Sequence, residues 1–165
     1  MRRIPRTART LAALALLALA TACAVVTNPV TGERELTVMS TREEVRLGQQ
    51  SAEAVREQIG LVEEADVAQL ADAIGARLAA LSPRQEVQYH FAVADMPEPN
   101  AFALPGGWIY VSRGLLAITN SEAELANVMG HEVGHVAALH ASQRQTRSAW
   151  VGLGTLLGAA AAGLA

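Results

Sequence analysis

The sequence has 165 residues, 51% of them hydrophobic and 18% charged, so it is too apolar to be disordered and suits one modest domain. All thirteen basic residues are arginines, and four of them precede the first acidic residue. The remainder has nine arginines against sixteen acidic residues, a net charge of −7, which argues against nucleic-acid binding. The single cysteine excludes an internal disulfide framework and a cysteine-rich zinc site, leaving histidines and carboxylates as metal ligands.

The first 22 residues are typical of an export signal. A basic segment from Arg2 to Arg9 precedes residues 11–20, which are only Leu and Ala and are too few to span a bilayer, since spanning takes about 20. The sequence Ala-Thr-Ala-Cys that ends at Cys23 resembles a bacterial lipobox. We therefore predict that residues 1–22 are a signal peptide and that lipidated Cys23 anchors the exported chain on the periplasmic side of the cell envelope. Ordinary signal cleavage after Ala22 is the alternative.

Residues 23–39 are polar and rich in turn signals, so we predict a tether with little regular structure, leading into a domain over residues 40–165. Ser40 and Glu43 form a capping-box pattern, and apolar residues recur at helical spacing from there to Gly60. The same spacing over 67–81, ended by Ser82-Pro83, predicts a second amphipathic helix.

The middle of the chain has the pattern of a small sheet. Residues 87–93 alternate between apolar and polar, which predicts a half-buried strand with His90 on its exposed face. Two further β-rich runs, 101–104 and 108–111, flank Pro105-Gly-Gly107, so we expect them to form a hairpin beside that strand.

A long helix is expected from the cap at Ser121 to about Gln145, and it contains His131-Glu-Val-Gly-His135. Residues four apart project from one face of a helix, so both imidazoles can hold one Zn²⁺ ion. Glu132, beside the first ligand, is then placed to act as the general base in peptide hydrolysis. The helix is markedly apolar, which makes these polar groups costly to bury without a metal or hydrogen-bond partners.

The sequence resembles metallopeptidase family 48, a family of zinc peptidases. The resemblance rests on the motif and on the segments 28–32, 100–107 and 121–126. It implies an α+β, gluzincin-type metallopeptidase domain that binds one zinc ion and acts on protein or peptide substrates. It further implies that the hairpin binds substrate backbone as an added strand, with Gly106, Gly107 and Trp108 as substrate-binding residues.

The third zinc ligand is where the sequence departs from the family. Relatives take it from a glutamate in a downstream Glu-x-x-x-Asp helix, whereas no Asp or Glu follows Glu132 here. A metzincin-type third histidine is also excluded, because position 141 is Ala. On a continuous helix His140 would be rotated about 140° from the ligand face, so we predict a structural or surface role for it. We therefore expect a C-terminally incomplete domain that binds zinc weakly and has little activity alone.

Residues 149–165 have no charge and are rich in Gly and Ala. As a helix they would reach about 25 Å, short of a hydrocarbon core of roughly 30 Å, so we predict a packed or membrane-contacting connector. The leading hypothesis is an exported zinc metalloendopeptidase that hydrolyses envelope proteins in quality control. The alternative is a non-catalytic lipoprotein that keeps the peptidase scaffold to bind proteins.

Overall fold

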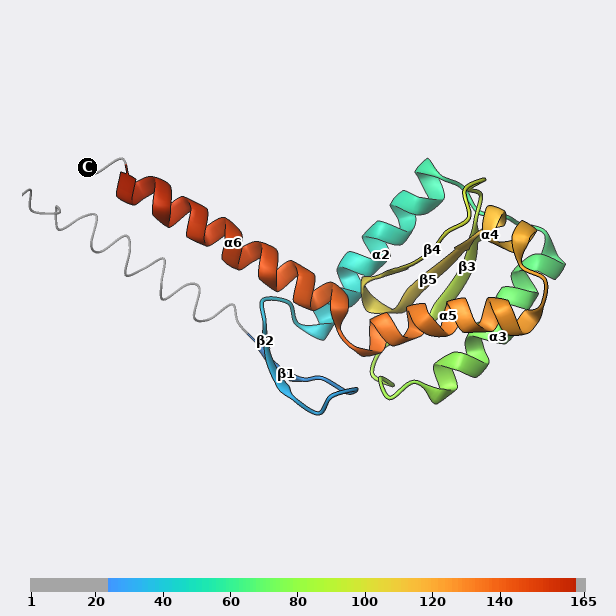
Figure 1. Ribbon diagram of the computed structural model, residues 1–165, viewed down its shortest axis with the longest axis horizontal. Coiled ribbons are helices and arrows are strands. Elements are labelled where there is room, and N and C mark those ends of the chain that lie inside the picture. The colour runs from blue at the N-terminus through green and yellow to red at the C-terminus, as the bar shows by residue number, and fades with distance from the viewer. Residues whose placement is uncertain (1–23, 163–165) are drawn as a thin grey trace, which may run out of the picture.

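The computed structural model describes residues 24–162, so the predicted signal peptide and Cys23 lie outside the described residues. The fold is α+β, as predicted. A two-stranded sheet pairs β1 (Ala24–Thr27) with β2 (Arg34–Thr37), and a three-stranded sheet has the order β3-β5-β4 (Figure 1). Strand β5 (Trp108–Ser112) is central, parallel to β3 (His90–Ala94) and antiparallel to β4 (Ala101–Leu104).

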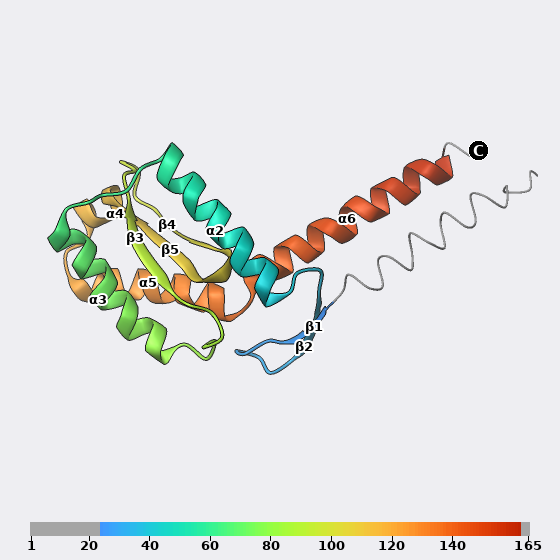
Figure 2. The same ribbon diagram turned by 180° about the vertical axis from the view of Figure 1, so that it is seen from behind.

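The three-stranded sheet lies between helices on both faces (Figures 1 and 2). Helix α2 (Thr41–Gln58) covers one face, where Ala52 and Val55 pack against Tyr110. Helices α3 (Ala65–Leu81) and α5 (Glu122–Ala137) cover the other face, where a core joins residues of both helices to β3 and β5. The coverage by α2 is incomplete, since His90 and Ala92 line a hollow beside this helix and are half-buried; His90 is therefore less exposed than the alternation predicts.

The predicted helix starts are confirmed. Ser40 caps α2 with a complete capping box, its hydroxyl accepting from the amide of Glu43 while the Glu43 carboxylate accepts from the amide of Ser40. Ser121 caps α5 through its hydroxyl, which accepts from the amide of Glu124, but the Glu124 carboxylate accepts from the amide of Asn120, so the reciprocal bond of a capping box is not formed. The hairpin is also confirmed: β4 and β5 are joined by the short 3-10 turn η1 (Pro105–Gly107), and the short helix α4 (Arg113–Ile118) follows.

The expectation of little regular structure in residues 23–39 was wrong. Strands β1 and β2 form an antiparallel hairpin with Val25 opposite Leu36. Its turn is organised by Asn28, which is 2% exposed and whose side-chain oxygen accepts from the amides of Val30 and Thr31. The turn signals were therefore real, but they mark a hairpin turn and not a loose segment.

The expected continuous helix from Ser121 to Gln145 is also wrong, because it breaks after α5. Ala138 leaves helical geometry, and Leu139 has a φ of 60° in the left-handed region. Helix α6 (His140–Ala162) then begins and leaves the body of the molecule in a new direction (Figures 1 and 2). Neither Gly nor Pro marks this break in the sequence, so the apolar spacing alone could not reveal it.

We predicted a packed or membrane-contacting connector over residues 149–165. The part of α6 that the structure describes does not match a packed one. Trp150 and Val151 are 47% and 61% exposed, although they line a shallow hollow together with Glu35 and Leu36 of β2. Within residues 24–162 no helix combines the length and apolar character needed to cross a membrane.

Candidate metal centre

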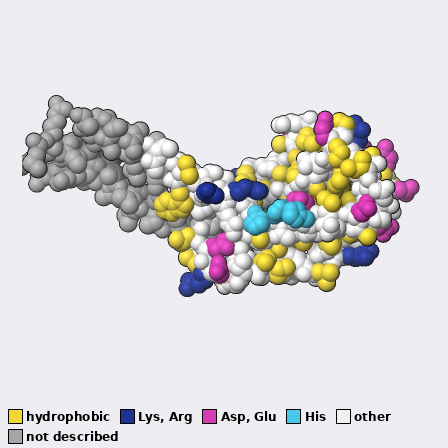
Figure 3. Space-filling view, viewed as in Figure 1, with side chains coloured by type: hydrophobic (Ala, Val, Ile, Leu, Met, Phe, Trp, Pro, Cys, Tyr) yellow, Lys and Arg dark blue, Asp and Glu magenta, His cyan; other side chains and the backbone are white. Residues whose placement is uncertain are grey.

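Helix α5 presents both histidines of the motif on one side, as their spacing predicts. The ring centroids of His131 and His135 are 4.4 Å apart in an edge-to-face arrangement. His131 is exposed and His135 is half-buried, whereas Glu132 between them is only 8% exposed. The space-filling view shows the histidines gathered on the surface over α5 and the start of α6 (Figure 3).

Among the described residues, one group of side chains could hold a metal ion. Each of His131, Glu132 and His135 offers one ligand atom, and these atoms all lie within 4.8 Å of one another. The two imidazoles are nitrogen donors of the kind that zinc accepts, and the carboxylate of Glu132 lies beside them. The residues present therefore fit the metal that the motif implies.

Burial lowers the pKa of His135, and nearby His131, His140 and Arg144 lower it further, against the opposing attraction of Glu132. The lowered pKa favours the neutral ring, which is the form that binds a metal.

Gly134, within the motif, has none of the described residues within 4 Å of the position a Cβ would occupy.

His140 does not lie where the sequence placed it. The helix break turns the start of α6 back toward α5, and the Nδ1 atoms of His135 and His140 are 2.6 Å apart. The prediction that His140 points away from the ligand face was wrong, because it assumed an unbroken helix.

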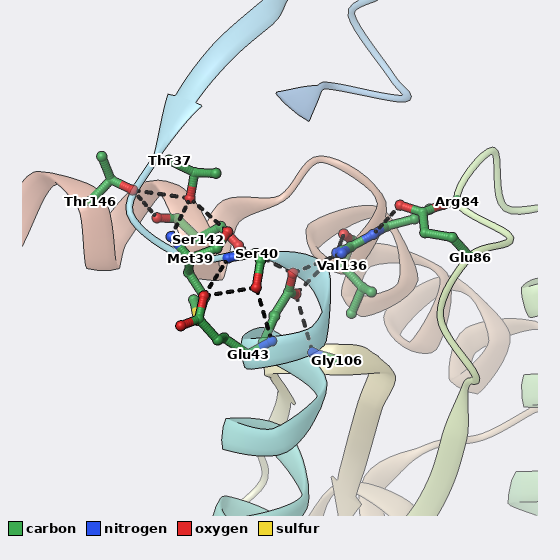
Figure 4. A network of polar contacts seen from close by, with 11 residues as sticks. Thr37, Met39, Ser40, Glu43, Arg84, Glu86, Gly106, Val136, Ser142 and Thr146 are labelled. Carbon is green, nitrogen blue, oxygen red and sulfur yellow. Dashed lines mark hydrogen bonds and ion pairs between the residues drawn. The ribbon is translucent and has the colours of Figure 1, made fainter. Parts of the chain in front are cut away.

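Sequence reasoning missed a buried polar network beside this centre. Arg84, 0% exposed, donates from Nη1 to the carbonyl oxygen of Val136, the residue after the second histidine, and forms an ion pair with Glu44. Glu44 also accepts from the amide of Gly106 and from the hydroxyl of Ser142 on α6 (Figure 4). No local pattern marks these residues, since Glu44 looks like an ordinary first-turn acid of a helix.

The structure gives packing roles to two of the three hairpin residues expected to bind substrate. Gly106 and Gly107 are buried. A Cβ on Gly106 would lie 2.7 Å from the Cα of Val45, and a Cβ on Gly107 would lie 2.4 Å from the carbonyl oxygen of Gln88. Trp108 is half-buried, and its ring stacks on His90 with centroids 4.0 Å apart. Burial in this stack lowers the pKa of His90.

A small sheet backed by a helix that presents a His-Glu-x-x-His motif defines the class of this protein as metal-dependent peptidases. Residues 64–165 match the family model described as Peptidase family M48, and the chain belongs to this family.

The relatives include the "Beta-barrel assembly-enhancing protease" of Escherichia coli (strain K12), 32% identical over 138 residues, which are 79% of this chain and 28% of that protein. The "Mitochondrial metalloendopeptidase OMA1" of Arabidopsis thaliana is 43% identical over 72 residues, 44% of this chain and 15% of that protein. The "Metalloendopeptidase OMA1, mitochondrial" of Danio rerio is 30% identical over 115 residues, 66% of this chain and 24% of that protein. The chain thus spans less than a third of the length of these relatives.

Proposed function

We propose that this chain forms the metal-binding core of a zinc metalloendopeptidase, with His131 and His135 as ligands and Glu132 as the general base. The observation that carries the proposal is the grouping of these three side chains on one side of α5. The names of the relatives, protease and metalloendopeptidase, support the same activity.

The chemistry divides between the metal and the protein. When bound, zinc supplies a Lewis acid that polarises the scissile carbonyl and lowers the pKa of the attacking water. Glu132 takes the proton of that water on its carboxylate and then donates it to the leaving amine. Its low exposure favours this role, because a carboxylate shielded from bulk water exchanges its proton with the bound reactants.

Strand β4 is the proposed site of substrate backbone. It is an edge strand of the three-stranded sheet and packs against α5, the helix of the motif. An extended peptide pairing with this edge would lie next to the metal ligands. Because Gly106 and Gly107 are packed against protein backbone, they act here by fixing the turn at the end of β4.

The cellular setting is proposed from the sequence of the first 23 residues: export to the bacterial envelope, lipidation at Cys23, and hydrolysis of envelope proteins in quality control. The name of the Escherichia coli relative refers to β-barrel assembly, which supports an envelope role. Exposed Trp150 and Val151 on α6 favour membrane contact by the 149–165 segment. Incorporation of radiolabelled palmitate into the wild-type protein and its loss in Cys23→Ser tests the anchor.

Zinc binding by the purified chain tests the site. Isothermal titration should show one zinc ion per chain, and His131→Ala and His135→Ala should each remove most of the binding. Glu132→Gln should retain it, because Glu132 acts as a base and not as an obligatory ligand. His90→Ala is the matched control, a histidine outside the group that stacks on Trp108. Binding that survives both ligand substitutions would refute the site.

Slow hydrolysis of an unfolded protein substrate is expected from the zinc-loaded chain alone, and this activity tests the catalytic role. Replacing Glu132 by Gln should lower kcat by about 10²-fold to 10⁴-fold, the usual contribution of a general base. Equal activity in the two proteins would favour the non-catalytic scaffold instead.

A further inference from the structure

The break between α5 and α6 is stabilised by the residues around it. Leu139 is 5% exposed and has a φ of 60°, a left-handed conformation that is unfavourable for a residue other than glycine. Such strain persists only where the surroundings impose it. The hydrogen bonds around Leu139 must therefore favour the break over a continuous helix.

Three segments distant in the sequence hold this break by hydrogen bonds. Asn28 in the β1–β2 turn donates from Nδ2 to the carbonyl oxygen of Ala138 at 3.1 Å. Arg84 donates to the carbonyl oxygen of Val136 at 3.0 Å. Ser142, in the first turn of α6, donates to the carboxylate of Glu44 at 3.2 Å (Figure 4). The position of the first residue of α6 is thus fixed from both sides of the break.

That first residue is His140, and the break places it against a proposed metal ligand. The Nδ1 atoms of His135 and His140 are 2.6 Å apart, so one of them carries a proton that it donates to the other. Because this contact engages Nδ1 of His135, Nε2 is the nitrogen that His135 has left for a metal.

His140 itself lies outside the metal-binding group. The ligand atoms within 4.8 Å of one another belong to His131, Glu132 and His135, and His140 is not among these residues. A ring in this position contacts a metal ligand without itself binding the metal. Such a hydrogen-bond partner fixes the tautomer and the orientation of the ligand.

We propose that His140 is a positioning residue for the metal site, which accepts a hydrogen bond from Nδ1 of His135 and so holds Nε2 of His135 unprotonated and aimed at the metal. This inference rests on the proposed zinc site. For Nδ1 of His140 to accept this hydrogen bond it must carry no proton, so the proton of the His140 ring lies on Nε2.

Zinc affinity and the tautomer of His135 test the proposal with three variants. His140→Leu removes the acceptor and should weaken zinc binding about 10-fold to 100-fold, the usual effect of losing the hydrogen-bond partner of a metal ligand. His140→Asn, whose amide oxygen can take the place of Nδ1, should retain most of the affinity. His90→Leu is the matched control and should bind zinc as the wild type does. Thermal unfolding of each variant identifies any loss that comes from misfolding.

The outcomes separate this inference from the proposed function. Nitrogen NMR of the metal-free wild-type chain should show the proton of His135 on Nδ1, and a proton on Nε2 would overturn the inference whether or not zinc binds. Unchanged zinc affinity in His140→Leu would overturn it while leaving the site intact. X-ray absorption showing three imidazoles on zinc in the wild type and two in His140→Leu would make His140 a ligand and overturn it as well. A wild-type chain that binds no zinc refutes the proposed function.

Discussion

Arg84 and Glu44 form a buried, two-point ion pair, with Nη2 of Arg84 2.7 Å from Oε2 of Glu44 and Nη1 3.0 Å from Oε1. Their side chains are 1% and 3% exposed. The pair has four further partners: Arg84 donates to a backbone carbonyl of α5 and to the carboxylate of Glu86, and Glu44 accepts from an amide of η1 and a hydroxyl of α6. The pair therefore joins α2 to each of the elements that surround the proposed metal site.

Replacing Arg84 by Met should destabilise the protein by roughly 3–5 kcal/mol, because it leaves the buried charge of Glu44 without its positively charged partner. The double variant Arg84→Met with Glu44→Leu should recover part of that loss, since it removes both charges together. Denaturant unfolding of the three proteins measures the free energies of unfolding.

The surface pair of Arg113 and Asp95 is the matched control for this experiment. Both side chains are about half exposed, at 52% and 53%, and water screens their attraction. Arg113→Met should therefore cost less than about 1 kcal/mol. Equal losses from Arg84→Met and Arg113→Met would contradict the structural role given to the buried pair.

The stability of the fold should fall in acid through Glu44. Burial opposes ionisation of this carboxyl, but the hydrogen bonds and charge of Arg84, with those of Gly106 and Ser142, lower its pKa below the ordinary 4.5. A group with a lowered folded pKa stabilises the fold above its unfolded pKa, and this contribution is lost as the pH falls through the folded pKa. The free energy of unfolding should decrease below about pH 4.5.

Measuring unfolding from pH 3 to pH 7 in the wild type and in Glu44→Gln checks this assignment. The variant should be less stable at pH 7 and should depend less on pH below 4.5. Two parallel pH curves would assign the acid sensitivity to other carboxyl groups.

Local patterns predicted the helices and the hairpin because each carries its own signal, as the N-cap residues Ser40 and Ser121 do at the starts of α2 and α5. The motif of His131 and His135 was predictable for the same reason: helical spacing alone places both rings on one side. What the sequence could not show depends on contacts between distant segments. The break at Leu139 is imposed by Asn28, Arg84 and other remote partners, and so is the approach of His140 to His135.

Gly107 is predicted to be required by its close approach to the backbone of Gln88, which precedes β3, as well as by its φ of 100°. Alanine there would bring a Cβ to 2.4 Å from the carbonyl oxygen of Gln88. Gly32 also has a positive φ, 72°, but nothing lies within 4 Å of its Cβ position, so Gly32→Ala pays only the backbone strain of about 1–2 kcal/mol. Gly107→Ala should cost about 1–3 kcal/mol more than this control, because the clash adds to the strain. Thermal and denaturant unfolding of both variants measure the difference, and similar losses would exclude the clash.

Two helical glycines should respond in opposite directions to the same substitution. Gly134 on α5 has open space around its Cβ position, so Gly134→Ala should stabilise the described fold by about 1 kcal/mol through helix propensity alone. Gly75 on α3 gains the same propensity from alanine, but its Cβ would lie 2.3 Å from the ring of Phe91. Overpacking of that kind costs about 1–3 kcal/mol, so Gly75→Ala should be neutral or destabilising. Denaturant unfolding of the metal-free variants compares them directly. A loss of stability in Gly134→Ala would show that the space beside the proposed ligands is filled by a contact that Gly134 must accommodate.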